Sequence, residues 1–189
     1  FSYTVDARLF KLELTCLAML QQAGHTNLRL MLPFVRTVDE FLFCRRLVEQ
    51  AGLMRTSNFQ LWIMAEVPSV LLLLPDYVEA GVQGISIGTN DLTQLLLGVN
   101  RDDAQLASVF EERHPAVKRA IAHLIQTARQ LGIPCSICGE APVRYPELIE
   151  ELVRWGIQSI SVAPEAIDAT YWEIARVEQA LLLESLRES

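Results

Sequence analysis

The segment of this sequence best suited to chemistry is an apolar run that ends in polar residues. Residues 87–94 read Ile-Gly-Thr-Asn-Asp-Leu-Thr-Gln, and residues 84–87 have the apolar character of a buried strand. Asn90 and Asp91 therefore stand where a strand ends, which is where α/β folds carry their functional groups. Glu66 ends a second apolar segment, Leu-Trp-Ile-Met-Ala-Glu, in the same way. We expect an amide and two carboxylates to meet at one edge of a sheet.

Two carboxylates on successive strand ends can converge on one hard cation. Mg²⁺ accepts one or two protein carboxylates, keeps bound waters, and takes its other ligands from an oxygen-rich substrate. Each acid also has an ordinary alternative role. Asp91 precedes Leu-Thr-Gln and could be the N-cap of a helix, and Glu66 could cap the helix that follows it.

Cys135 and Cys138 form a Cys-x-x-Cys pair, which could indicate a redox pair or half of a zinc site. We reject both readings because the two residues lie on one predicted strand, where positions three apart point to opposite faces. Zinc would also need a second pair of ligands. Cys135 is predicted to be a core residue. Cys138 lies at the C-terminal end of the strand. Its side chain either faces the same cavity as Glu66 and Asp91 or is an ordinary buried thiol, since cysteine is often buried.

The other candidates are less specific. His25, His114 and His123 have neither a neighbouring nucleophile nor ligand spacing, and we predict that they are surface or cap residues. Arg36 follows the first strand and could contact an anion or bridge neighbouring loops; the sequence leaves both open.

The elements that must position these residues alternate regularly. Strands are predicted at residues 28–34, 61–67, 84–87, 133–138 and 157–162, mostly apolar on both faces, as buried parallel strands are. Helices are predicted at 37–51, 116–131, 147–155 and 164–187, with Thr37 and Glu40 as a capping box and Pro115 and Pro146 in first turns. This βα alternation suits either an open doubly wound sheet or part of a (β/α)8 barrel. A whole barrel needs about 250 residues and eight strands.

The composition and net charge of the chain exclude several kinds of function. The 189 residues are 51% hydrophobic and 21% charged, which suits a single soluble domain, and the net charge of −7 argues against binding nucleic acid or anionic membranes. Charged residues interrupt the first 20 positions, and the longest apolar run, residues 70–74, is too short to span a bilayer. Four cysteines without a secreted-scaffold pattern indicate a reducing cytoplasm.

With these residues assigned, the chain resembles the C-terminal part of the phosphoenolpyruvate-utilising enzymes. This family includes phosphoenolpyruvate synthase, pyruvate phosphate dikinase and enzyme I of the sugar phosphotransferase system. The similarity is carried by Met-Leu-Pro-Phe-Val-Arg-Thr-Val at 31–38, Ala-Glu-Val-Pro-Ser at 65–69, Ser-Ile-Gly-Thr-Asn-Asp-Leu-Thr-Gln at 86–94 and Ile-Cys-Gly-Glu at 137–140. Residues 31–38, 100–102 and 112–118 are most similar to the synthase branch.

The resemblance implies that residues 1–189 form one partial TIM (β/α)8-type barrel with about five C-terminal βα units. It implies that pyruvate or phosphoenolpyruvate and Mg²⁺ bind at the strand C-termini. Glu66 and Asp91 would be metal ligands, and Cys138 would be the acid/base at the methyl or methylene carbon. The substrate would be contacted by Glu66, Gly88, Thr89, Asn90 and Asp91.

The resemblance also implies partners. In the family an ATP-binding domain loads a phosphohistidine domain, the full reaction converts ATP, pyruvate and water to AMP, phosphoenolpyruvate and phosphate, and the barrel mediates homodimerisation. Neither domain lies within these residues, and the first barrel strands with the family's two phosphate-binding arginines are not matched, so we expect the isolated chain to be inactive. The alternatives are a non-catalytic dimerisation or regulatory module and a Mg²⁺-dependent pyruvate-enolate lyase, which residues 87–94 fit less well.

Overall fold

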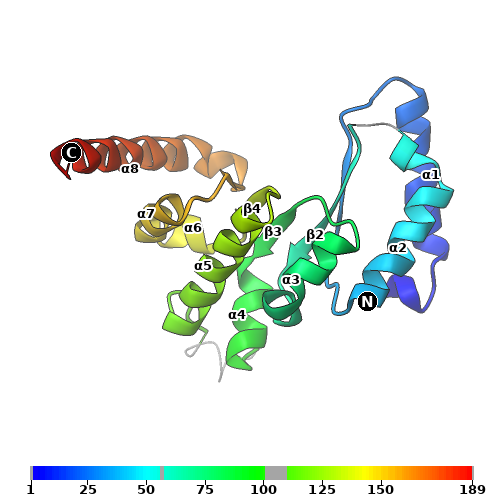
Figure 1. The fold of residues 1–189 in the computed structure, drawn as a ribbon, viewed down its shortest axis with the longest axis horizontal. Coiled ribbons are helices and arrows are strands. Elements are labelled where there is room, and N and C mark those ends of the chain that lie inside the picture. Colours follow the sequence, from blue (N-terminus) through cyan, green and yellow to red (C-terminus); the bar gives the residue numbers. More distant parts are fainter. Residues whose placement is uncertain (1, 56–57, 101–109, 189) are drawn as a thin grey trace.

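Five parallel strands form one sheet at the centre of the chain (Figure 1). The computed structural model describes residues 2–55, 58–100 and 110–188. The strands are β1 (Arg29–Leu32), β2 (Gln60–Ala65), β3 (Ile85–Gly88), β4 (Cys135–Cys138) and β5 (Ser159–Ile160). All five predicted strands are confirmed, and β5 is the shortest at two residues.

The strand order decides between the two architectures that the sequence left open. The strands lie in the order β1-β2-β3-β4-β5, and every neighbouring pair is parallel. A doubly wound sheet reverses its strand order at a switch point, whereas a barrel adds each strand beside the one before it. The observed order never reverses, so the fold is a segment of a (β/α)8-type barrel.

Most of the helices lie in the connections between successive parallel strands. They are α1 (Arg8–Gln22), α2 (Val38–Gln50), α3 (Ser69–Glu79), α4 (Thr89–Leu97), α5 (Pro115–Gln130), α6 (Ala141–Arg144), α7 (Pro146–Trp155) and α8 (Ile167–Glu188), with short 3-10 turns η1 (Ser2–Thr4), η2 (Leu53–Arg55) and η4 (Pro164–Ala166). α2, α3, α5 and α7 pack in sequence against one another, as right-handed crossovers on one face of a sheet require. α1 and α8 lie at opposite ends of the molecule (Figure 1). The four predicted helices are confirmed within a few residues, except that residues 164–166 form the 3-10 turn η4.

The predicted helix starts have the expected local chemistry. The Thr37 hydroxyl accepts the N–H of Glu40 at 3.2 Å, and the Glu40 carboxylate accepts the N–H of Arg36 at 2.8 Å. Pro115 and Pro146 occupy the first positions of α5 and α7. At the other end of α7, Gly156 adopts the left-handed conformation, with φ of 88°.

The two faces of the sheet differ in character. In a parallel ladder, residues in register point to the same side. The helix-covered face is apolar and fully buried; it includes Leu61, Ile63, Ala65, Ile85, Ile87 and Ile137. The opposite, inner face carries Trp62 and Met64 on β2 but Ser86 and Ser136 on β3 and β4. The prediction that the strands are apolar on both faces is therefore wrong for β3 and β4, because their inner face leads to a polar site.

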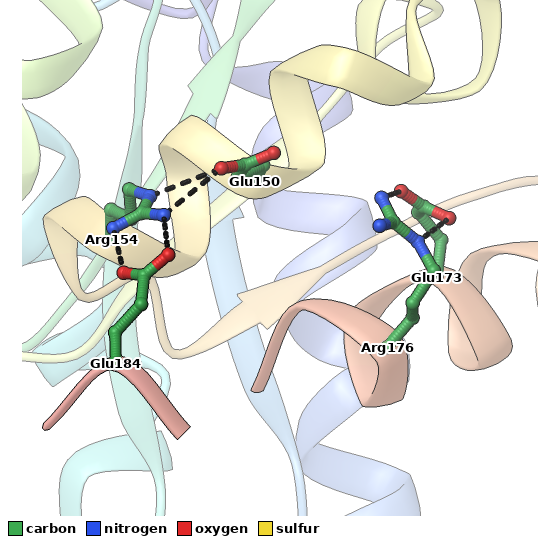
Figure 2. A network of polar contacts seen from close by, with 5 residues as sticks. All are labelled: Glu150, Arg154, Glu173, Arg176 and Glu184. Atoms are coloured by element: carbon green, nitrogen blue, oxygen red, sulfur yellow. Dashed lines mark hydrogen bonds and ion pairs between the residues drawn. The ribbon is translucent and has the colours of Figure 1, made fainter. Parts of the chain in front are cut away.

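Helix α8 contacts α7 through a surface ion pair as well as through packing (Figure 2). Arg154 on α7 pairs with Glu150 one turn away at 3.1 Å and with Glu184 on α8 at 2.9 Å, while Glu173 and Arg176 pair within α8. Exposed pairs of this kind contribute only about 0–1 kcal/mol each. The buried side chain of Val177 contributes more to seating α8. None of the helices in the described part of the chain has the length and apolarity needed to cross a bilayer.

Candidate active site

The predicted site residues come together at the carboxyl ends of β2, β3 and β4. The register pairs Ala65 with Ile87 and Gly88 with Cys138. Glu66, Gly88 and Cys138 therefore stand level on the inner face of three neighbouring strands, with Gly88 in the middle. A β-carbon on Gly88 would lie only 2.8 Å from Oε2 of Glu66. It would also lie 2.9 Å from Cε of Met64, so only glycine lets the Glu66 carboxylate and Met64 pack this closely against β3.

Glu66 is a buried acid held by a backbone donor. Its side chain is only 4% exposed, and Oε1 accepts the N–H of Phe34 at 2.7 Å. Burial raises the pKa of Glu66, the Phe34 hydrogen bond opposes this rise, and the negative charge of Asp91 adds to it. α3 begins at Ser69 after Pro68, and the Glu66 carboxylate bonds to the β1–α2 turn. The alternative role of Glu66 as a cap for the next helix is therefore wrong.

Asp91 lies in the first turn of α4. The residue at the N-cap position is Gly88, so Asp91 is the third residue of the helix and the alternative of an N-cap aspartate is wrong. Asn90 and Asp91 are half-buried, whereas Gly88 and Thr89 are buried. The helix N-terminus favours negative charge at this position.

The two acids suit a cation that takes most of its ligands from elsewhere. Among residues 2–55, 58–100 and 110–188, no three His, Cys, Asp or Glu side chains gather into a metal-binding group. Asp91 is close enough to Glu66 for its charge to raise the pKa of Glu66, and a bound cation would relieve that repulsion. This donor set fits Mg²⁺, which accepts two carboxylates and completes its shell with water and substrate oxygens.

Cys138 lies half-buried on the same inner face as Glu66, and Cys135 lies buried on the opposite face, as predicted. The Cys138 thiol donates to the carbonyl of Ile87 at 3.5 Å. Burial raises the pKa of Cys138, a hydrogen bond with Ser86 opposes the rise, and the charges of Glu66 and Asp91 add to it. All four cysteines are free thiols. In the absence of a cation the Cys138 group is held as the neutral thiol, which is a proton donor.

A second glycine brings α4 and the end of β4 into close contact. Gly139 has φ of 106°, and a β-carbon there would lie 2.2 Å from the Thr89 hydroxyl oxygen. The adjacent N–H of Glu140 donates to Oδ1 of Asn90 at 3.4 Å. The turn that follows Cys138 thus holds the Asn90 side chain by a hydrogen bond and packs closely against Thr89.

The remaining candidates lie away from these groups or serve local structure. The His114 side chain caps α5 by accepting the N–H of Ala116 at 3.1 Å, and His123 contacts the carbonyl of Leu71 at 3.1 Å. His25 is exposed. The Arg36 guanidinium pairs with Glu40 at 2.6 Å. The backbone carbonyl of Arg36 accepts the Ser69 hydroxyl at 2.8 Å, which supports the prediction that Arg36 bridges neighbouring loops.

Sequence reasoning missed two residues of this region. Phe34 contributes through its backbone N–H, for which the side chain gives no signal. Glu112 is a buried acid that hydrogen-bonds with Thr89, yet in sequence it sits among Glu111 and Arg113 and resembles a surface residue. Part of the segment 100–102 that resembles the synthase lies outside the described residues.

Comparison with solved structures supports the fold. An HpcH/HpaI aldolase/citrate lyase family protein from Burkholderia cenocepacia superposes with a TM-score of 0.56 at 19% identity, covering 90% of this chain and 68% of that one. A citrate lyase from Burkholderia xenovorans gives a TM-score of 0.57 at 21% identity, covering 76% of this chain and 48% of that one. At these identities the likeness concerns the fold alone.

Comparison with known sequences identifies the family. The phosphoenolpyruvate synthase of Aeropyrum pernix is 45% identical over 182 residues, which are 95% of this chain and 22% of that protein. The phosphoenolpyruvate synthase of Aquifex aeolicus is 42% identical over 159 residues, 84% of this chain and 18% of that protein. The chain thus spans about a fifth of the length of these relatives. The family model described as "PEP-utilising enzyme, PEP-binding domain" matches residues 3–179, and the chain belongs to this family of phosphoenolpyruvate-utilising enzymes as its phosphoenolpyruvate-binding domain.

Proposed function

We propose that this domain binds pyruvate and phosphoenolpyruvate in a phosphoenolpyruvate synthase-like phosphotransferase. The complete enzyme would convert ATP, pyruvate and water to AMP, phosphoenolpyruvate and phosphate. The observation that carries the proposal is the row Glu66–Gly88–Cys138 with Asp91 beside it. The row places two acids and a thiol together at the ends of three neighbouring strands.

In this proposal Glu66 and Asp91 hold Mg²⁺. When bound, the cation supplies Lewis-acid stabilisation of the negative charge that develops on the enolate oxygen. Phe34 keeps the Glu66 carboxylate pointed into the site through its N–H at 2.7 Å. The partial positive charge at the α4 N-terminus, where Thr89 and Asn90 stand, favours an anionic substrate. Whole-chain charge does not provide this attraction, because the net charge is −7.

Cys138 moves the proton at carbon 3 of the substrate. Towards phosphoenolpyruvate, the thiolate takes a methyl proton of pyruvate, and the C–H electron pair becomes the C2–C3 double bond. The carbonyl π pair moves to oxygen in the same step. The enolate oxygen then attacks the phosphorus of the phosphohistidine, and as the O–P bond forms the N–P bond breaks and its electron pair stays on the histidine nitrogen. In the other direction the thiol returns the proton. The neutral thiol favoured in the free site suits this return step, since a general acid must carry its proton before it acts.

The proposal includes partners. A phosphohistidine domain and an ATP-binding domain would act with this one, and the relatives are long enough to contain them. A homodimer is also proposed. Exposed apolar side chains on α8, among them Trp172, Leu182 and Leu186, favour an interface there, and the same observation favours the alternative of a non-catalytic dimerisation module.

Calorimetric titration with oxalate, a planar mimic of the pyruvate enolate, tests the proposal. We expect binding with Mg²⁺ and none without it. Glu66→Gln should remove this binding, whereas Glu178→Gln, which neutralises an exposed acid on α8, should not. Absence of binding by a chain shown to be folded would favour the dimerisation module.

A second experiment tests the role of Cys138 separately from metal binding. In the complete enzyme, Cys138→Ala should abolish exchange of the pyruvate methyl protons with deuterated solvent while leaving Mg²⁺-dependent oxalate binding intact. Cys16→Ala, at an exposed thiol on α1, is the matched control and should leave exchange unchanged. Retained exchange in Cys138→Ala would remove Cys138 from the mechanism.

A further inference from the structure

The turn between β1 and α2 is held in an unfavourable conformation beside the site. Phe34 in this turn has φ of 50°, and its N–H donates to Oε1 of Glu66 at 2.7 Å. A residue with a side chain keeps positive φ only where the surrounding structure fixes it there. The contacts that hold this turn therefore decide how firmly the Phe34 N–H faces the Glu66 carboxylate.

Ser69, the first residue of α3, holds the turn at a second point. Its hydroxyl lies 2.8 Å from the carbonyl oxygen of Arg36, two residues after Phe34. A carbonyl oxygen can only accept, so the single hydrogen of the Ser69 hydroxyl is donated to Arg36. Because Ser69 also follows Glu66 by three residues, the two hydrogen bonds and the two short segments 34–36 and 66–69 form a closed ring.

Other contacts fix the position of the turn without replacing the Ser69 bond. The side chain of Val35 is fully buried, and the N–H of Arg36 donates to the Glu40 carboxylate at 2.8 Å. Apolar packing places the turn against the core but does not specify how its peptide groups are rotated. The Arg36 carbonyl is held by Ser69 alone among the hydrogen bonds found in residues 2–55, 58–100 and 110–188.

The hydroxyl of Tyr77, two turns further along α3, is also near Ser69. Burial raises the pKa of Tyr77 to about 12, and the proximity of Ser69 partly opposes the rise. The Tyr77 hydroxyl itself makes no hydrogen bond within the part of the chain that the structure describes. Its removal therefore serves as a control for changes that act on α3 but not on the turn.

We propose that Ser69 is a positioning residue that acts through the Arg36 carbonyl to hold the strained β1–α2 turn, and so keeps the Phe34 N–H directed at the Glu66 carboxylate. Ser69 itself touches neither substrate nor cation in this proposal. The two hydrogen bonds are independent of any ligand. The effect on binding rests on the proposed function, because it is measured with Mg²⁺ and oxalate.

The first test needs no ligand. Hydrogen–deuterium exchange of the Phe34 amide is measured by NMR in the ¹⁵N-labelled chain, because exchange reports local opening of the hydrogen bond. We expect Ser69→Ala to speed this exchange by roughly five- to tenfold, the effect of losing one net hydrogen bond. Ser69→Thr, which keeps a hydroxyl, should restore the rate. Amides of β3 should exchange at their unchanged rates, which separates a local effect from a loss of global stability.

Two variants serve as controls for this measurement. The Ser185 hydroxyl on α8 also donates to a backbone carbonyl at 2.8 Å, so Ser185→Ala removes a bond of the same kind far from the turn in sequence. Tyr77→Phe removes the hydroxyl near Ser69 that makes no hydrogen bond among the described residues. Both should leave exchange of the Phe34 amide unchanged.

A double variant tests whether Ser69 acts against the strain at Phe34. Glycine adopts positive φ without strain, so Phe34→Gly removes the conformational cost that Ser69 opposes. We expect Ser69→Ala to speed exchange of the residue-34 amide by a smaller factor in the Phe34→Gly background than in the unchanged chain. Equal factors in the two backgrounds would overturn the proposal, because Ser69 would then act independently of the strained residue.

The second test measures binding. We expect Ser69→Ala to weaken Mg²⁺-dependent oxalate binding by about tenfold, the lower end of the range typical of groups that orient metal ligands, and Ser69→Thr to bind like the unchanged chain. If the unchanged chain binds no oxalate, the proposed function fails and the exchange measurement still decides the role of Ser69. An unchanged rate for the Phe34 amide in Ser69→Ala, or an equal acceleration of the β3 amides, would overturn the proposal whatever the binding result.

Discussion

The backbone N–H of Phe34 donates to the carboxylate of Glu66 at 2.7 Å, across 32 positions of the sequence. Phe34 has φ of 50° and is the one non-glycine residue with positive φ in the part of the chain that the structure describes. This conformation costs roughly 1–2 kcal/mol for a residue with a side chain. Since Phe34 is 43% exposed, packing alone does not explain why the conformation is kept. The short bond to a charged acceptor gives a reason, because such bonds are stronger than neutral ones.

Phe34→Gly and Phe34→Ala form a pair that isolates this strain. Both remove the aromatic ring, and only glycine accepts positive φ without strain. We expect the glycine variant to be the more stable by about 1 kcal/mol, which reverses the usual order of the two residues. Urea unfolding measures the difference. Greater stability of the alanine variant would show that the turn does not depend on the left-handed conformation.

Gly139→Ala should be more damaging than substitution of a glycine with a similar backbone in open space. The new β-carbon would meet the buried Thr89 hydroxyl at 2.2 Å, so the close approach of α4 to β4 would be lost. Gly24 has φ of 98° and nothing within 4 Å of its added β-carbon, which makes Gly24→Ala the matched control. Both variants incur backbone strain of about 1–2 kcal/mol, and we expect Gly139→Ala to lose a further 1–3 kcal/mol from overpacking. Equal melting temperatures would contradict the predicted contact.

The stability of Glu112→Gln should depend on pH in a defined direction. Burial raises the pKa of Glu112, and the Thr89 hydrogen bond and the charge of Arg144 only partly oppose this. Between the unfolded and the folded pKa the folded state binds more protons, so stability of the unchanged chain falls as pH rises through this interval. The glutamine variant lacks this loss. Its stability relative to the unchanged chain should therefore increase as pH is raised from about 4 to 8.

Glu111 provides a control, because its pKa is shifted in the opposite direction to that of Glu112. The hydrogen bonds from Arg113 lower the pKa of Glu111 to about 2. Its ionised form is favoured by folding, so Glu111→Gln should lose stability at neutral pH, and this loss should shrink as pH falls below about 4. Denaturant titrations of both variants at pH 4, 6 and 8 measure the two trends. Parallel trends would mean that the burial of Glu112 has no energetic effect.

The four cysteines should react with a thiol-alkylating reagent in a fixed order. Burial raises the pKa of Cys44 and of Cys135 to about 12, so both should stay unlabelled until the chain unfolds. Exposed Cys16 should react first and half-buried Cys138 more slowly. Mg²⁺ together with oxalate should slow labelling of Cys138 and leave Cys16 unaffected, and removing the cation with a chelator should restore the rate. Mass spectrometry of digested samples identifies each site, and protection of Cys16 to the same extent would indicate a general effect of the additives.

The sequence by itself determined the features that depend on near neighbours. The strand and helix positions follow from apolar runs, from Thr37 at a helix start and from proline in first turns, all short-range effects. The opposite facing of Cys135 and Cys138 follows from the two-residue period of a strand. The same short-range reasoning placed Glu66 and Asp91 at strand ends, although it could not choose between a site and a helix cap.

Only the tertiary structure decided the features that depend on pairing between distant segments. Strand order has no local signature, so the barrel-type sheet was established only by the observed order β1-β2-β3-β4-β5, in which each strand pairs with the next. The common level of Glu66, Gly88 and Cys138 requires the register of three strands. The Phe34 bond to Glu66 and the burial of Glu112 against Thr89 join positions far apart in the chain, and no pattern of residue types predicts which distant backbone or side chain will be the partner.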